Sequence, residues 1–492
     1  MKKFIENIKN GMRKLFELIT NKWLLKGTTT IALVAVVIAC YIGLNWAVEK
    51  LTIEDLDFTT KKLYSLSDET KKRLNELDEN ITIQLINMSE DTYVVEYANK
   101  YKNASNKVII EEIDDLESRV DIQTKYNISS TESLIVVKNG DIEKVLTAND
   151  LITYDYTTYK QIDVTEEAIT NAIVEVTIDE KPQIYVFNGN TYNPAEASLG
   201  IIANALIDEA NDMHLLDILT EGRVPENCDC LIITTLKQDL SKLERDKILE
   251  YINNGGKLLI LSSQNILEVD TPNFEQILAQ YGVKIEHGII YEQDSSKMLY
   301  DTPNMIVANA SAGFMSDIDM SLRIFLANAG KIQFADETKL EELGVTYETI
   351  ASTSESSFVR TDFSQESKSR TDKDSEVGSS IVGAHVTKKL SEDKTSQLII
   401  YSNETFASTS QLIIGYQSVF AVSLYNNEDV VLNSVSHLTE RDDTITIRKT
   451  NETEHYTVTE QEDAIIKTII FVVPILIIGA GIVVMFVRRR SI

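Results

Sequence analysis

Hydrophobic residues are concentrated in two long uncharged stretches, one on each side of a large region in which polar and apolar positions alternate. Residues 28–47 read TTTIALVAVVIACYIGLNWA, and residues 468–487 read TIIFVVPILIIGAGIVVMFV. About 20 apolar residues of helix are needed to cross a bilayer core about 30 Å thick. We therefore predict two transmembrane helices. The first lacks a signal-peptide cleavage site before Glu49 and is expected to be retained.

The pattern between residues 49 and 180 predicts one compact domain of mixed helices and strands. The expected elements are, in order, a helix from Ser67 through Leu77, a strand at 81–86, a helix near 92–102, a strand at 108–113 and a hairpin at 133–146. Ser67 is a favourable helix cap, and ITIQLI at 81–86 alternates as a half-buried strand does. Asn139-Gly140 is the strongest short-range hairpin signal.

This order of elements resembles a thioredoxin-like fold. A redox enzyme of that fold would place its C-x-x-C motif just after the first core strand, where this chain reads Asn87-Met88-Ser89-Glu90. Disulfide exchange needs a thiolate, and none is present at these positions. The domain is therefore predicted to be a scaffold or a binding module.

Residues 181–450 alternate strand and helix patterns. The expected elements are, in order, a strand at 182–187, a helix around 196–210, strands at 214–219 and 230–235, a helix that follows Ser241, a strand at 257–261 and a short helix around 274–281. Ser241 and Glu244 have the spacing of a capping box. Such alternation predicts an α/β domain with a doubly wound, flavodoxin-like parallel sheet.

Two segments of this part of the chain lack such a pattern. Residues 352–380 are rich in Ser and charged side chains, which is typical of a mobile loop or insertion. Residues 451–467 form a juxtamembrane segment that leads into the second apolar stretch. We assign no structure or function to 352–380.

Charged residues flank the two apolar stretches asymmetrically. Residues 1–27 form a basic segment, and the tail 488–492 carries three arginines, whereas acidic residues lie on the other side of each stretch. Lys and Arg near the ends of a span stay on the cytoplasmic side. Both termini are therefore predicted to be cytoplasmic, with residues 49–463 extracytoplasmic.

The extracytoplasmic part is strongly acidic. Removing +5 for residues 1–26 and +3 for the terminal arginines from the net charge of −29 leaves −37 on the rest. Nucleic-acid phosphates require Lys and Arg partners, so this charge excludes a nucleic-acid-binding protein.

Cysteines are too few for a disulfide framework. Cys40 lies in the first apolar stretch, and only Cys228 and Cys230 lie outside the two stretches. The pair opens the apolar run CDCLIITT, which favours small buried strand residues over a strained redox pair.

No pattern of a nucleophile, a metal site or a phosphate loop is present. Ser262-Ser263 follows the strand at 257–261 without the glycines of a G-x-S-x-G elbow, which favours a loop or a helix cap. Asn254-Gly255-Gly256-Lys257 lacks the phosphate-loop spacing. The histidines form no H-x-H or HExxH group; they are His214, His287, His385, His437 and His455. We assign no catalytic, cofactor-binding or metal-ligating residue and no cofactor, and we predict that the protein is not an enzyme.

Four segments in consistent order resemble the GldG-like ABC-transporter auxiliary family. They are DFTTKKLYSLSDETKKRLNELDENITIQLI at 57–86, VPENCDCLIITTLKQDLSKLERDKILEYINNGGKLLILSS at 224–263, YNNEDVVLNSVSHLTERDDTITIRKT at 425–450 and the terminal VPILIIGAGIVVMFVRRR. The resemblance implies an amidotransferase-like fold for the second domain. Many members carry a Gly-His-Gly-Glu-like turn where this chain reads Asn188-Gly189-Asn190-Thr191.

The resemblance also implies a function. Members act as accessory subunits beside a separate multispanning ABC permease and a separate cytoplasmic ATPase. We expect a non-catalytic, membrane-anchored subunit of the bacterial plasma membrane whose extracytoplasmic domains bind a partner or substrate. The alternatives are a stand-alone binding or sensing protein and, less favoured, a hydrolase with an unrecognised site. Homo-oligomerisation is left open.

Overall fold

The computed structural model describes residues 65–88, 92–155, 160–191, 198–315, 322–365, 367–414 and 417–441. Both predicted transmembrane stretches, both basic ends and the segment 451–467 lie outside these ranges, so they stay predictions. Within the described ranges, no helix is long and apolar enough to span a bilayer.

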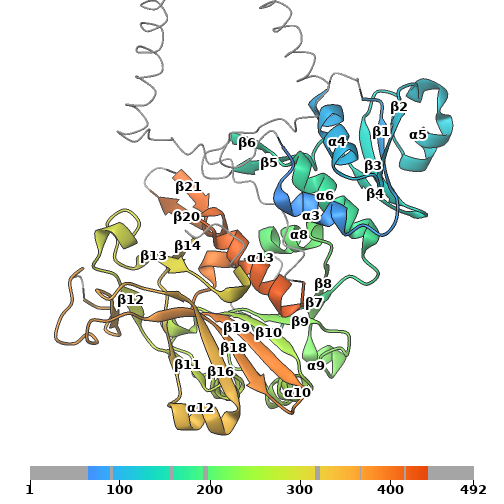
Figure 1. Ribbon diagram of the computed structural model, residues 1–492. Coiled ribbons are helices and arrows are strands. Elements are labelled where there is room, and N and C mark those ends of the chain that lie inside the picture. Colours follow the sequence, from blue (N-terminus) through green and yellow to red (C-terminus); the bar gives the residue numbers. More distant parts are fainter. Residues whose placement is uncertain are drawn as a thin grey trace, which may run out of the picture. The chain divides into compact units, whose positions relative to one another are not determined.

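The first part of the described chain contains a four-stranded sheet in the order β2-β1-β3-β4 (Figure 1). Its elements are α3 (Asp68–Asn75), β1 (Ile81–Ile86), α4 (Tyr93–Ala104), β2 (Val108–Ile113), α5 (Val120–Tyr126), β3 (Leu134–Asn139), β4 (Ile142–Leu146), the hairpin of β5 (Ile152–Asp155) and β6 (Lys160–Asp163), and α6 (Thr165–Thr177). Strand β1 runs parallel to β2 and antiparallel to β3. The predicted helices, strands and hairpin are all present.

Helices cover both faces of this small sheet. Ile81, Ile83 and Leu85 of β1 are buried in one cluster with residues of α3, α4 and α6, whereas Ile86 belongs to a second cluster that includes Ile122 of α5. Successive side chains of a strand point to opposite faces, so the alternation in ITIQLI explains this division.

The hairpin differs from its prediction by one residue. Asn139 pairs with Ile142, so the two loop residues are Gly140 and Asp141. Gly140 has a φ of +58°, which glycine adopts without a steric penalty. Asn139 is therefore the last strand residue and not the first residue of the turn.

The second part of the described chain is built on a large sheet whose one half is parallel. Strands β8 (Asp212–Leu216), β7 (Gln183–Phe187), β9 (Cys230–Ile233), β10 (Lys257–Leu261) and β19 (Thr395–Tyr401) lie side by side in that order. All four neighbouring pairs are parallel. The connecting helices are α8 (Gly200–Asp208), α9 (Ile218–Glu221), α10 (Lys242–Asn253) and α11 (Pro272–Ala279). The mixed α/β class with parallel sheet segments is thus confirmed.

The other half of the large sheet is antiparallel, which corrects the prediction of a purely parallel sheet. Beyond β19 follow β18 (Ile381–Lys389), β16 (Val345–Ser352), β13 (Met305–Ala310) and β14 (Arg323–Ala327), while β15 (Lys331–Phe334) pairs with β11 (Val283–Glu286) and β18. Short loops, such as residues 390–394 between β18 and β19, join antiparallel neighbours without a crossover helix. The remaining elements are β12 (Ile289–Tyr291), α12 (Glu337–Leu343), β17 (Phe358–Arg360), β20 (Gln411–Ile414), β21 (Gln417–Phe420) and α13 (Asn427–Leu438).

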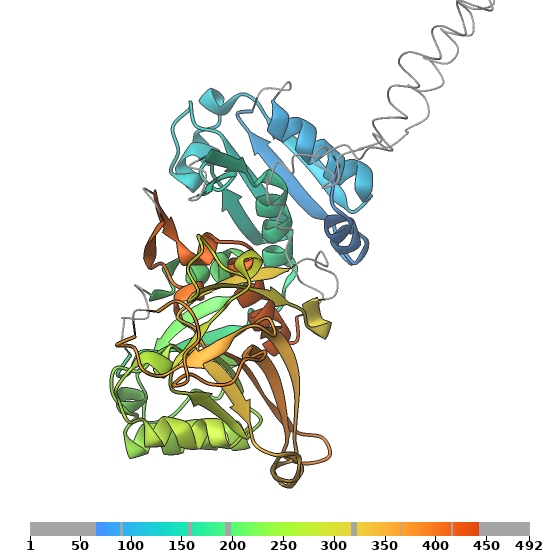
Figure 2. The same cartoon turned by 90° about the vertical axis from the view of Figure 1, so that its left-hand side faces the viewer.

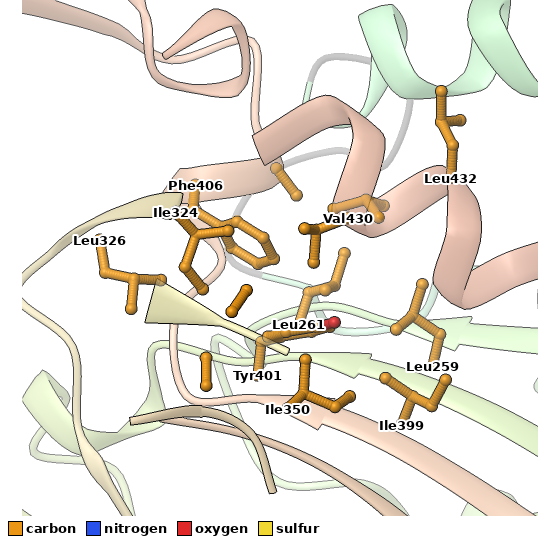
Figure 3. Packing of buried hydrophobic residues seen from close by; sticks show 14 of the residues in the cluster. Leu259, Leu261, Ile324, Leu326, Ile350, Ile399, Tyr401, Phe406, Val430 and Leu432 are labelled. Atoms are coloured by element: carbon orange, nitrogen blue, oxygen red, sulfur yellow. The ribbon is translucent and has the colours of Figure 1, made fainter. Parts of the chain in front are cut away.

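Two hydrophobic clusters cover the two faces of the large sheet. Ile399 and Tyr401 of β19 lie in the cluster that includes Val430 of α13, whereas Leu398 and Ile400 lie in the cluster of α10 and α11. Figure 3 shows the first cluster, with Val430 above the side chains of the central strands. Because both faces are covered, the central strands are nearly continuous apolar runs.

The segment 352–380 is not devoid of regular structure. It contains β17, which pairs with β12. The Arg360 guanidinium binds Asp374 at 3.0 and 2.8 Å and also donates to the backbone oxygen of Ser369. The side chains of Arg360 and Asp374 are both completely buried. The sequence left the structure of this segment unassigned, and its mobility in solution stays a prediction.

Candidate functional site

The carboxyl ends of the parallel strands lie at one edge of the large sheet. In open α/β sheets, ligands bind outside these ends. The loops that follow β7, β9, β10 and β19 contribute residues 188–191, 234–237, 262–265 and 402–404. We name this set of residues the carboxyl edge.

Glu404 is a buried carboxylate that joins several segments at the carboxyl edge. Its side chain accepts hydrogen bonds from Ser198 Oγ at 2.5 Å and from the backbone N–H of Thr235 at 3.0 Å. Its own backbone N–H donates to Ser263 Oγ at 2.9 Å. Only 5% of Glu404 is exposed. The residue thus connects the ends of β19, β9 and β10 with the start of α8.

The two serines after β10 form hydrogen bonds with backbone groups and with the Thr235 hydroxyl. Ser263 donates its backbone N–H to Thr235 Oγ1 at 2.8 Å. The hydroxyl oxygen of Ser262, which is fully buried, accepts from the backbone N–H of Gln264 at 3.3 Å. Within the described ranges, neither hydroxyl has a histidine or a carboxylate side chain as a hydrogen-bond partner. A serine nucleophile needs such a base for activation. The hydrogen bonds of the two serines therefore agree with the prediction that they belong to a loop.

Two buried side-chain oxygens at the carboxyl edge have spare hydrogen-bonding capacity. Thr234 Oγ1 and Asn265 Oδ1 have no hydrogen-bond partner in the described part of the chain. The amide nitrogen of Asn265 does donate, to the backbone oxygens of Gly288 and Asn328. Buried polar atoms are nearly always paired in folded proteins, with protein groups or with water. These two atoms are the unpaired acceptors at this edge.

The turn after β7 is fixed to the neighbouring loop. The backbone oxygen of Asn190 accepts from the N–H of Lys237 at 2.7 Å, and Thr191 forms an antiparallel bridge with Leu236. A Cβ atom on Gly189 would lie 2.8 Å from Glu244 Oε1, so the backbone passes very close to helix α10. The turn therefore lies directly beside the loop that follows β9 at the carboxyl edge.

The Cys228 and Cys230 thiols are free and buried. Burial raises the pKa of the Cys228 thiol to about 12 and holds the pKa of the Cys230 thiol well above its ordinary value. The thiolate is the reactive form, and it is strongly disfavoured at neutral pH. This environment supports the interpretation as buried residues, but only Cys230 lies in a strand, because β9 begins there and Cys228 precedes it.

The fold brings two histidines together that are far apart in the sequence. The rings of His385 in β18 and His437 in α13 lie 4.7 Å apart, and Phe314 stacks on His437 at 4.4 Å. His214 stacks on Tyr185 at 4.8 Å, His287 lies near Phe363, and His455 lies outside the described residues. Across the described ranges, no group of three or more His, Cys, Asp or Glu side chains is placed to hold a metal ion. Sequence spacing gave no signal for the His385–His437 contact.

Comparisons with solved structures find only distant likenesses. The N-terminal domain of mmIFT52 has 10% sequence identity and a TM-score of 0.38, and the match covers 52% of this chain and 96% of that one. A putative ThuA-like protein from Bacteroides uniformis has 11% identity and a TM-score of 0.30, covering 53% of this chain and 94% of that one. No curated protein sequence matches significantly. The fold therefore rests on the strand order itself.

A protein-family model also matches this chain. It is described as an ABC-type uncharacterized transport system and matches residues 181–434, which include the whole carboxyl edge. The matched residues make up more than half of the 492-residue chain. The chain therefore belongs to this ABC-transporter auxiliary family.

Proposed function

We propose that this protein is a non-catalytic accessory subunit of an ABC transport system, anchored in the bacterial plasma membrane at both ends. Membership of the family supports a role in transport. The uncharged stretches at 28–47 and 468–487, with basic residues outside them, support the anchors and a cytoplasmic position of both termini. Residues 49–463 then lie outside the cytoplasm.

The partners we propose are a multispanning ABC permease and a cytoplasmic ATPase. ABC transport requires ATP hydrolysis, and this sequence contains no G-x-x-x-x-G-K-[ST] phosphate loop. ATP binding and hydrolysis are therefore assigned to a separate subunit. The GldG-like type of auxiliary protein is the member class that the four matching sequence segments favour.

Two domain assignments belong to the same proposal. For residues 49–180, the strand order β2-β1-β3-β4 with a parallel first pair supports a thioredoxin-like domain. For residues 181–450, the five parallel strands between two helical layers support an amidotransferase-like, flavodoxin-like domain.

We propose the carboxyl edge as the surface that binds the partner or the transported substrate. Its exposed side chains, Asn188 and Lys237, can contact a partner, and the buried Glu404 carboxylate fixes the loop that carries Lys237. Its serine hydroxyls are bound to backbone groups instead of a general base. These features favour recognition without covalent chemistry.

Site-specific photo-crosslinking in native membranes tests this proposal. A photoreactive amino acid replaces Lys237, which is exposed on the carboxyl edge, and a matched control replaces Lys284, which is exposed on β11. We expect a permease subunit to be crosslinked from position 237 and not from position 284. Crosslinks to neither a permease nor a cargo, with the protein abundant in the membrane, would favour an independent binding or sensing protein.

The hydrolase alternative has a separate test. Ser262→Ala and Ser263→Ala variants would abolish an activity that depends on either hydroxyl. We expect both variants to support transport as the unchanged protein does, provided that their abundance in the membrane is equal.

A further inference from the structure

Residues 405–427 form a continuous segment of 23 residues without a charged side chain. At the 25% of charged residues found in the whole chain, a segment of this length would carry about six. The segment contains the hairpin of β20 and β21 and ends at the start of α13. It is a neutral stretch within a region whose net charge is strongly negative.

The hairpin has one packed face and one exposed face. Leu412 pairs with Val419, and both belong to a small cluster with Phe325 and Leu424. Ile413 pairs with Ser418 on the opposite face, and 81% of Ile413 is exposed. A two-stranded hairpin alone is marginally stable, so its packed face holds it in place. Figures 1 and 2 show the hairpin projecting from the periphery of the large sheet.

Two tyrosines are exposed around the same small cluster. Tyr300 is 68% exposed and follows Leu299, which packs against the cluster. Tyr425 is 37% exposed, follows Leu424 and bridges to Ile324 of the edge strand β14. Tyrosine side chains combine an apolar ring with a polar end, a combination that is enriched at membrane–water interfaces.

We propose that the β20–β21 hairpin rests in the interfacial layer of the lipid bilayer, with Ile413 inserted among the acyl chains. This contact adds a third membrane attachment to the two anchors, and it rests on the membrane anchoring of the proposed function. It would fix the orientation of the large sheet, and with it the direction in which the carboxyl edge faces.

The length of the chain outside the described residues places the bilayer within reach. Residues 48–64 connect the first apolar stretch to Ser65, and an extended chain of that length spans at most about 60 Å. The C-terminal connection, residues 442–467, is longer. With both anchors in the membrane, the extracytoplasmic part can therefore reach the bilayer surface.

Charge favours the hairpin over the rest of the surface as the contact. Any anionic headgroups of the outer leaflet repel a protein region that carries a net charge of about −37, because like charges repel. The exposed hairpin positions Gln411, Ile413 and Ser418 are uncharged. This neutral surface approaches a bilayer without that electrostatic cost.

Tryptophan fluorescence of the full-length protein in vesicles tests the inference. The chain has two tryptophans, Trp23 and Trp46, and both are first replaced by Phe. Ile413→Trp then provides the reporter. Leu243→Trp is the matched control, because Leu243 is 45% exposed on α10, a helix that packs in a different hydrophobic cluster from the hairpin. Both proteins are reconstituted in phosphatidylcholine vesicles with and without brominated acyl chains.

We expect the Ile413→Trp protein to show blue-shifted emission and about twofold quenching by brominated lipid, while the Leu243→Trp protein is unaffected. Equal emission of the two proteins without lipid quenching would overturn the inference. A second outcome would also overturn it: the tryptophan at position 413 is not quenched by lipid and is protected from aqueous iodide only when permease is added. The hairpin would then contact protein. Extraction of the membranes with carbonate separates the two proposals. A protein that stays in the membrane but is not quenched contradicts only this inference. A protein that is extracted contradicts the proposed anchoring.

Discussion

The parallel and the antiparallel half of the large sheet share hydrophobic clusters, but their connecting segments are held by different means. In the parallel half, helices connect the strands, and α10 begins with the capping box of Ser241 and Glu244. In the antiparallel half, buried charges fix the connecting segments: Arg360 binds Asp374, and Glu292 accepts hydrogen bonds from three backbone N–H groups and from Ser354 Oγ. Apolar periodicity is visible in a sequence, whereas pairing between distant charges is not.

The largest effect should come from breaking the buried ion pair of the antiparallel half. Asp374→Ala leaves the Arg360 guanidinium buried without its carboxylate, which should lower the free energy of unfolding by about 3–5 kcal/mol. Lys373→Ala is the control, since Lys373 and Asp362 form an exposed pair that contributes about 0–1 kcal/mol. Urea unfolding of both full-length variants measures the difference. Equal stability of the two variants would show that the buried pair does not hold the segment.

Apolar packing should matter most at completely buried strand positions. Leu259→Ala creates a cavity at such a position of β10 and should cost about 2–5 kcal/mol. Leu412→Ala, at a partly buried position of the hairpin, which is a separate two-stranded sheet, should cost clearly less. Thermal unfolding of the two variants gives the comparison. A larger loss for Leu412→Ala would contradict this dependence on burial.

The carboxyl edge, which is formed by loops of the parallel half, should show an intermediate effect. In Glu404→Ala, the Ser198 hydroxyl and the Thr235 N–H both lose their acceptor. We expect a loss of about 1–3 kcal/mol in unfolding free energy. Ser198→Ala should cost no more than that, because the Thr235 contact remains. Unchanged stability in Glu404→Ala would remove Glu404 as the residue that connects these loops.

The smallest effect concerns pH. The hydrogen bond from Arg360 holds the pKa of Asp374 below its ordinary value. The stabilisation is therefore fully present above the unfolded pKa of about 4 and is lost as the pH falls through the lower folded pKa. As the pH falls from 5 into the acidic range, the unchanged protein should lose more stability than Asp374→Asn, whose side chain does not titrate. Parallel stability curves in urea titrations at each pH would contradict this.

Local signals explain which parts of the fold could be predicted. The capping box at Ser241 and the strand at 257–261 depend on neighbouring residues, and both are present as predicted. The Asn139-Gly140 hairpin was predicted within one residue, because the dipeptide marks a turn without fixing its register. The antiparallel strands were not predicted, since their pairing depends on partners far along the chain.

The candidate site was less accessible to prediction than the fold. Glu404 is bound by Ser198 and Thr235, which are about 200 and 170 residues away in the sequence, and a carboxylate in such a loop has no local signature. The interpretations of Cys228 and Ser262 depended only on neighbouring residues, and their buried surroundings agree with them. Chain topology, not residue pattern, assembles the carboxyl edge.

The most direct test of the central claim is a mild-detergent purification of the tagged full-length protein from its own membrane, with co-purifying proteins identified by mass spectrometry. The account predicts stoichiometric recovery of an ABC permease and its ATPase. The Lys373→Ala protein, whose stability should hardly change, should recover the same subunits. Recovery of intact, abundant protein without either subunit would contradict the accessory role.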